Sequence, residues 1–190
     1  MIQSKKDLRF YIQEDFNSNL NGKKKSFVEY HIKKIIGHEG VMACEYLKCL
    51  RKLEYFINCR KDFFGNIYKV LYKVKLQRLS LRLGIQISPN TCGYGLRLLH
   101  FKIGGGIIIN CISMGNYCSV NAGVVVGNKD SQKNRPTIGN NVKLNVGCKV
   151  IGKITIGNNV IVAPNSVVVK DVPNNAIVSG IPSTILKIKE

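Results

Sequence analysis

Histidine is the side chain best suited to exchange a proton near neutral pH, and this chain of 190 residues has three, at positions 31, 38 and 100. His100 closes the stretch LRLLH at 96–100, where leucines surround it. Two interpretations are open for such a residue. The imidazole could act as a general base, or it could be a structural ring packed among its apolar neighbours. The secondary structure around His100 determines which of these two interpretations holds.

Cysteine is the other residue type that could carry chemistry. The chain has seven cysteines, an odd number, and none of them forms a C-x-x-C pair. Disulfide frameworks and zinc sites usually show paired spacing. We therefore expect reduced, mostly buried thiols that behave as small hydrophobic residues, and no metal.

The formal net charge of +18 favours anionic partners such as nucleic acid, anionic lipid or a phosphate-rich small molecule. The sequence has neither zinc spacing nor a basic motif interleaved with aromatic residues, so we expect no nucleic-acid binding. No apolar run approaches the roughly 18 residues of a membrane span. Residues 1–20 lack the continuous apolar core of a signal peptide. These observations predict a cytoplasmic protein.

The two parts of the chain differ in composition. Residues 1–84 contain few glycines and have apolar residues at helical spacing, and they predict an α-helical region of three or four helices. One apolar stripe in this region consists of Ile67, Val70, Leu71 and Val74. Over residues 85–190, Gly, Asn, Val and Ile become frequent. We predict a second, mainly β domain there.

An internal repeat defines this second domain. The hexamer TIGNNV occurs at 137–142 and again at 155–160, an offset of 18 residues. Within this offset, apolar residues recur every six positions: Ile138, Leu144, Val150, Ile156, Val162 and Val168. A period of six is neither the 3.6 of a helix nor the 2 of a simple strand, and it is the signature of a β-helix built from hexapeptides. A glycine-rich β-sandwich would give no reason for it.

The period also predicts how the β-helix is built. Each hexapeptide forms a short strand and a corner, and three hexapeptides close one coil, so residue i+18 lies above residue i. The recurring Ile, Val and Leu point into the prism, while Gly and Asn at the corners tolerate positive φ. We expect about five coils between 85 and 186.

Four stretches carry a resemblance to a known family: GYGLRLLH, CSVNAGVVVGN, the repeat that begins PTIGNNVKLNV, and SGIPSTIL. They resemble the hexapeptide-repeat acetyltransferases, and in particular the serine O-acetyltransferase-like group. The resemblance covers just over half of the chain. It implies left-handed coils, acetyl-CoA as the acyl donor, and a homotrimer with the cofactor in a groove between neighbouring subunits.

The resemblance also assigns the site. In that family the GxGLxLxH stretch ends in the catalytic histidine, a role that falls on His100. The imidazole would take the proton of an acceptor hydroxyl as it attacks the acetyl thioester, so transfer is direct. The positions expected to follow the cofactor are Gly127, Asn128, Asn145, Val146, Ala163 and Pro164. The basic residues expected to meet its acidic groups are Arg135 and Lys187.

Departures from the family's pattern bear on the acceptor. Serine acetyltransferases of this family have an Asp before the catalytic His and another in an upstream D-I-H-P stretch, where this chain has Leu99 and Gln86. A family His in a D-R-H-P loop is replaced by the KNRP of this chain, with Arg135 near that position. A serine ammonium group would lose its carboxylate partners. We therefore expect a sugar hydroxyl of a surface polysaccharide as acceptor, with serine as the alternative.

A non-catalytic docking scaffold is the alternative of another class. Segment 60–82 combines basic residues with aromatic ones and could lie on an anionic membrane surface, at the inner membrane face. The same segment could instead be a helix that packs against another helix or against the base of the β-helix.

Overall fold

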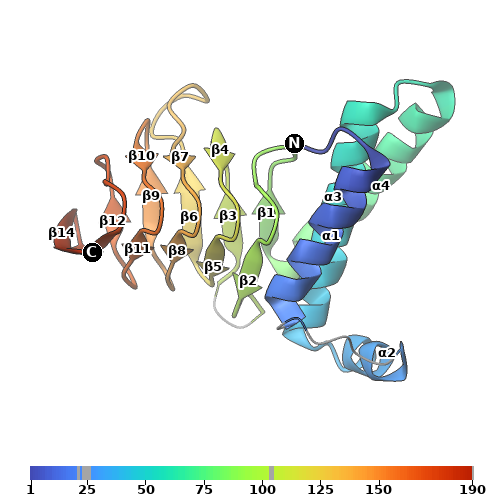
Figure 1. Ribbon diagram of the computed structural model, residues 1–190, viewed down its shortest axis with the longest axis horizontal. Coiled ribbons are helices and arrows are strands. Elements are labelled where there is room, and N and C mark those ends of the chain that lie inside the picture. The colour runs from blue at the N-terminus through green and yellow to red at the C-terminus, as the bar shows by residue number, and fades with distance from the viewer. Residues whose placement is uncertain (21, 23–26, 103–104, 190) are drawn as a thin grey trace.

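A computed structural model describes residues 1–20, 22, 27–102 and 105–189. Helices come first, short parallel strands wind through the rest of the chain, and the helices stack on one end of the strand region (Figure 1). The architecture confirms the predicted parallel β-helix with an N-terminal α-helical region.

The described residues form four helices: α1 (Lys5–Leu20), α2 (Phe27–Ile35), α3 (Glu39–Cys59) and α4 (Phe63–Leu83). In Figure 1, α1, α3 and α4 lie together against the first coil, while α2 projects from their lower end. The carboxylate of Asp62 caps α4 by accepting the Gly65 N–H. Gly84 ends α4 in the left-handed conformation, with φ of 68°, and the first strand follows directly.

The described strands lie on three faces of a prism. Face A stacks β1 (Ile85–Ile87), β3 (Ile107–Ile109), β6 (Val124–Gly127), β9 (Lys149–Ile151) and β12 (Val167–Val168). Face B stacks β4 (Ser113–Met114), β7 (Thr137–Ile138) and β10 (Thr155–Ile156). Face C stacks β2 (Arg97–Leu99), β5 (Ser119–Asn121), β8 (Lys143–Leu144), β11 (Ile161–Val162), β13 (Ala176–Gly180) and β14 (Ser183–Ile188).

The strand register confirms the 18-residue stacking. Thr137 lies beside Thr155 and Ile138 beside Ile156, so the two TIGNNV segments occupy the same place in successive coils. The described chain returns to face A four times after β1. Bridges at Cys92 and Val172 extend face B by one residue at each end.

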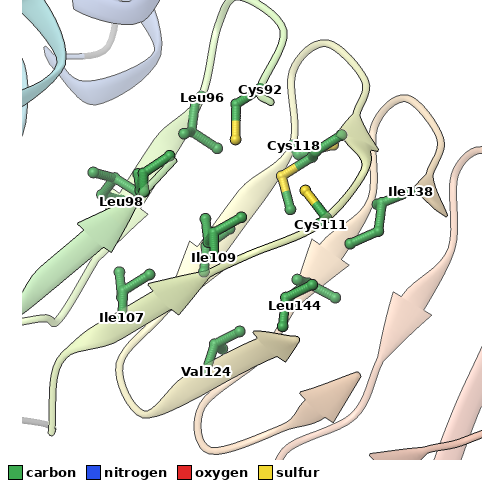
Figure 2. Packing of buried hydrophobic residues seen from close by; sticks show 14 of the residues in the cluster. Cys92, Leu96, Leu98, Ile107, Ile109, Cys111, Cys118, Val124, Ile138 and Leu144 are labelled. Atoms are coloured by element: carbon green, nitrogen blue, oxygen red, sulfur yellow. The ribbon is translucent and has the colours of Figure 1, made fainter. Parts of the chain in front are cut away.

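The hydrophobic core fills the prism. The residues of the six-residue period are each at most 2% exposed. Figure 2 shows Ile138 and Leu144 pointing into the same interior as Leu98, Ile107 and Ile109. The cluster continues without a break into α3 and α4, where it includes the buried residues Met42, Tyr46, Leu47, Leu50, Leu76 and Leu83. Helices and coils therefore share one core.

Asparagine side chains tie the coils together at the corner between faces B and C. The Oδ1 of Asn140 accepts the Asn116 N–H at 2.8 Å, that of Asn158 accepts the Asn140 N–H at 2.8 Å, and that of Asn174 accepts the Asn158 N–H at 2.7 Å. A Cβ at Gly139 would lie 2.8 Å from the carbonyl carbon of Gly157, so the corner also requires glycine.

A buried ion cluster joins the helices to the first coil. The Arg51 guanidinium, fully buried on α3, donates to Asp15 Oδ2 at 2.8 Å, to Glu54 Oε2 at 3.0 Å and to the Cys92 carbonyl at 2.9 Å. Asp15 Oδ1 in turn accepts the Leu96 N–H at 3.0 Å. Each charged group thus has partners, as burial requires.

Helix α4 packs differently from what its most evident stripe suggests. The stripe of Ile67, Val70, Leu71 and Val74 is 42–58% exposed. The helix instead turns Leu76 and Leu83 into the core, with Tyr72 and Leu79 packed beside them. Segment 60–82 thus includes most of a helix that packs against α3 and β1 and leaves an apolar stripe outside.

The far end of the β-helix is covered on one face only. β14 turns back and pairs antiparallel with β13, and most of its residues are exposed. Among the described residues, no helix is long and apolar enough to cross a membrane.

Candidate active site

The corner between faces C and A, here named the C–A edge, collects five of the predicted site residues. Leu99 pairs with Asn121, Val120 with Leu144, and Leu144 with Val162. Counting on along the chain, the residues that follow these strands stack in adjacent coils. They are His100 in the first coil, Asn145 and Val146 in a later one, and Ala163 and Pro164 in the next.

His100 lies at the surface of this edge. Its side chain is 70% exposed, which excludes the interpretation as a packed structural ring. Its backbone adopts the left-handed conformation, with φ of 58°, directly after β2. The imidazole Nδ1 lies 3.9 Å from Glu39 Oε2. The ring therefore has one nitrogen facing a carboxylate and can offer the other to a substrate.

The rest of the C–A edge carries the side chains of Asn145, Val146, Ala163 and Pro164. The Asn145 side chain donates to the Val162 carbonyl at 2.8 Å, which holds it along the edge. Val146 is 44% exposed and Pro164 is exposed, so both present apolar atoms outward.

Three other predicted residues lie on a different corner, between faces A and B. Gly127 ends β6, Asn128 follows it, and the loop that leads to β7 contains Arg135. Arg135 is half-buried: its Nε donates to the Gln132 carbonyl at 2.8 Å and its Nη1 to Asn110 Oδ1 at 3.3 Å. Within one chain, the structure therefore does not bring these residues to His100.

Lys187 lies on β14, paired with Ile177 and exposed. β14 and β2 are at opposite ends of the face C sheet. At about 4.8 Å per strand, the five steps between them place Lys187 about 24 Å along the axis from the strand before His100. Lys187 could meet only the part of a long ligand farthest from the reacting atoms.

Glu39 is a candidate site residue that no pattern in the sequence indicated. It stands in the first turn of α3, and its Oε1 also lies 3.5 Å from the Lys102 N–H. The Lys102 ammonium donates to the Gly37 carbonyl at 2.6 Å, so the chain after His100 is fastened to the turn before α3. No local pattern in the sequence pairs Glu39 with His100, because 61 positions separate them.

Leu99 and Gln86 occupy the two positions where the family resemblance leads us to expect a carboxylate. Leu99 is half-buried beside His100, and Gln86 is exposed on β1. Neither supplies a negative charge at the edge. In this chain, a carboxylate reaches His100 from the helical region instead.

The pKa is raised for six of the seven cysteines, in five of them chiefly by burial, whereas a hydrogen bond with Cys111 lowers the pKa of Cys92. All seven lie in the described ranges as free thiols, and six of them are buried, in line with the predicted burial. Burial raises the pKa of Cys44 and of Cys148 to about 12, and that of Cys118 to about 11. These three groups are thiols rather than reactive thiolates at neutral pH. In the described residues, no cluster of His, Cys, Asp and Glu could hold a metal ion.

Comparison with known proteins first gives the class of the repeat. Residues 135–170 match the family described as bacterial transferase hexapeptide (six repeats). This segment of the β-helix is thus similar to the hexapeptide repeats of bacterial transferases.

Individual relatives narrow the class. Serine acetyltransferase of Synechococcus elongatus is 39% identical over 107 residues, which is 54% of this chain and 43% of the relative. Serine acetyltransferase of Staphylococcus aureus (strain Mu50) is 38% identical over 106 residues, which is 55% of this chain and 49% of the relative. These matches confirm the resemblance to hexapeptide-repeat acetyltransferases of the serine acetyltransferase-like group. The matched part spans less than half the length of these curated relatives.

Solved structures share the fold over nearly the whole chain. Serine acetyltransferase of Neisseria gonorrhoeae aligns with 98% of this chain and 69% of its own, with a TM-score of 0.71 and 22% identity. Serine acetyltransferase of Brucella abortus, solved in complex with coenzyme A, aligns with 98% of this chain and 70% of its own, with a TM-score of 0.70 and 20% identity. The likeness therefore includes the helical region as well as the coils.

Proposed function

We propose that this chain is an O-acetyltransferase that moves the acetyl group of acetyl-CoA directly to an acceptor hydroxyl, with His100 as general base. The observation that carries this proposal is the exposed imidazole of His100 at the C–A edge, in line with the residues assigned to the cofactor. The names of the relatives and the coenzyme A complex of a similar structure support it.

The proposed reaction has one bond formed and one broken at the acetyl carbonyl. The acceptor hydroxyl gives its proton to Nε2 of His100 while its oxygen bonds to the carbonyl carbon. The carbon–sulfur bond then breaks, and the imidazolium returns the proton to the leaving thiolate. Acceptor ester and coenzyme A thiol are the products, and the base is regenerated.

Glu39 is proposed as the positioning residue for His100. A carboxylate that faces Nδ1 favours the tautomer with the proton on Nδ1 and leaves Nε2 free to accept a proton. This arrangement would replace the Asp that precedes the catalytic His in the family and that is Leu99 here. It would also make the helical region part of the active site, because Glu39 belongs to α3.

A second copy of the chain would complete the cofactor groove. Gly127, Asn128 and Arg135 lie on a corner of the prism different from that of His100, so one chain does not bring them together. In a homotrimer, the corner between faces A and B of one subunit would face the C–A edge of its neighbour. Arg135 would then meet the acidic end of acetyl-CoA from the adjacent subunit.

L-serine is the first acceptor to test, because the similar relatives are named serine acetyltransferases. The expectation of a polysaccharide sugar has no support from these names. One observation keeps a sugar hydroxyl as the second candidate: Leu99 and Gln86 leave a serine ammonium group without the carboxylates it would need.

The test is thiol release from acetyl-CoA with L-serine, and with nucleotide-linked and lipid-linked sugars, under otherwise equal conditions. Turnover with serine would assign the first acceptor, and turnover with a sugar only would assign the second. Acetyl-CoA that fails to bind in calorimetry would refute the proposal, and so would binding without turnover on any acceptor hydroxyl of either class.

Glu39→Gln is expected to lower kcat about tenfold, which corresponds to about 1.4 kcal/mol of transition-state stabilisation. The KM for acetyl-CoA should stay unchanged, because Glu39 contacts His100 and not the proposed cofactor track. Steady-state kinetics measure both parameters, and Glu29→Gln on α2 is the matched control. An equal loss in the control, or a raised KM with an unchanged kcat, would contradict the positioning role.

A further inference from the structure

The outward side of α4 takes no part in the proposed acetyl transfer. We propose that this side of α4 binds an anionic membrane surface. The partner is a lipid bilayer with negatively charged headgroups, and the helix would lie along its interface.

Helix α4 has two apolar stripes on opposite sides. One consists of Tyr72, Leu76, Leu79 and Leu83, which pack into the core. The other faces away from it, since successive residues of a helix are 100° apart. Its members are Phe63 (74% exposed), Ile67 (42%), Val70 (58%), Val74 (47%) and Leu81 (78%).

The outward stripe is unbroken from Phe63 to Val74, about 17 Å at 1.5 Å per residue, and resumes at Leu81 after Gln77 and Arg78. The exposed Phe64 and Leu71 widen it on one side. Single exposed apolar residues are ordinary, but this many on one side of one helix indicate a surface with a partner.

The charges that flank the stripe are all positive. On a helical wheel, Lys69 and Lys73 lie on one side of it and Lys75 and Arg82 on the other. Arg78 lies between Ile67 and Leu71, and α4 contains no acidic residue. The carboxylate nearest in sequence, Asp62, is already paired with Arg60, with Nε and Oδ1 2.7 Å apart. The long side chains can bury their methylenes and still hold their charges at the headgroups.

Charge complementarity selects the membrane over a second copy of the chain. Two α4 helices packed stripe to stripe would bring ten cationic side chains together, with no carboxylate of either helix between them. An anionic bilayer instead supplies an apolar layer for the stripe and negative headgroups for the flanks. A net charge of +18 for the whole chain strengthens the attraction.

The experiment is sedimentation of the full chain with vesicles of phosphatidylcholine alone, or of phosphatidylcholine mixed with phosphatidylglycerol. We expect at least tenfold stronger binding to the mixed vesicles. Binding should weaken when salt rises from about 0.1 M to 1 M, which shortens the screening length from about 10 Å to 3 Å. Equal binding to both vesicles, or to neither, would overturn the proposal.

Two variants with matched chemistry sharpen the test. Val70→Gln with Val74→Gln removes apolar groups from the outward stripe and should weaken binding to mixed vesicles at least tenfold. Val28→Gln with Ile32→Gln makes the same kind of change at exposed positions of α2, 62% and 53% accessible, and should leave binding unchanged. Circular dichroism checks that both variants stay folded.

Analytical ultracentrifugation of the same variants tests the competing possibility, that a second copy of the chain packs on the outward stripe. If the α4 variant lowers the oligomeric state of the chain in solution and the α2 variant does not, a second copy covers the stripe and the membrane proposal is wrong. An unchanged oligomeric state, together with lost vesicle binding, supports it.

Discussion

Replacing His100 with Asn is expected to lower kcat for acetyl transfer by about 10²- to 10⁴-fold, the usual contribution of a positioned general base. Asn is the informative substitute because residue 100 has a φ of 58°, and Asn tolerates the left-handed conformation better than other residues without a proton-accepting nitrogen. Thiol release from acetyl-CoA with the best acceptor measures the effect.

Binding of coenzyme A and thermal unfolding separate this loss from damage to the fold. Both should match those of the unmodified chain, because the His100 side chain is 70% exposed and supports no packing. His31→Asn on α2 is the control for loss of an imidazole. A His100→Asn enzyme that keeps more than a tenth of its turnover would remove His100 from the role of base.

Replacing Arg51 with Met is expected to reduce the free energy of unfolding by about 3–5 kcal/mol. The change leaves the carboxylates of Asp15 and Glu54, each 2% exposed, buried without their cation. It also removes the donors to the Cys92 and Gly93 carbonyls, which fasten α3 to the first coil. For a chain of this length the melting temperature should fall by roughly 10 °C, as measured by calorimetry.

The pH dependence of this loss has a definite sign. Burial raises the pKa of Asp15 and Arg51 opposes the rise, with a net upward direction. A carboxyl with a raised pKa is stabilising at low pH and loses that contribution as the pH climbs through its folded value. Without Arg51 the pKa rises further, so the variant should be closest to the unmodified chain in acid and furthest from it at neutral pH.

Arg60→Met is the control for the Arg51 variant. Arg60 also pairs with an aspartate, Asp62, but the two side chains are 40% and 44% exposed. An exposed ion pair contributes at most about 1 kcal/mol to stability, so the melting temperature of this control should fall only slightly. If both variants lost the same free energy of unfolding, the buried ion cluster would contribute no more to stability than an exposed ion pair.

The repeat is the part of the molecule that the sequence predicts best. A six-residue apolar period can be satisfied only by coils that stack at 18 residues, so Ile138 and Ile156 had to become neighbours. The helices of residues 1–84 follow from ordinary apolar spacing.

Tertiary packing decides what the sequence leaves open. Helix α4 has apolar residues on both sides, so spacing alone does not tell whether Val70 or Leu76 faces the core. The exposure of His100 and its approach to Glu39 depend on how α3 docks on the first coil. A contact across 61 positions between a helix and a strand end leaves no periodic trace. The acceptor is likewise set by side chains outside the repeat.

The unequal ends of the β-helix set where the native structure opens first. Three helices and a fully buried ion cluster close the first coil, whereas the exposed β14 alone covers the last. In a one-dimensional stack each coil is held by its neighbours, so fraying starts where a neighbour is missing. Amide hydrogens should therefore exchange fastest in β12 and β14 and slowest near β2. His100 lies at the end that opens least often, whereas Ala163 and Pro164 lie closer to the end that opens most often.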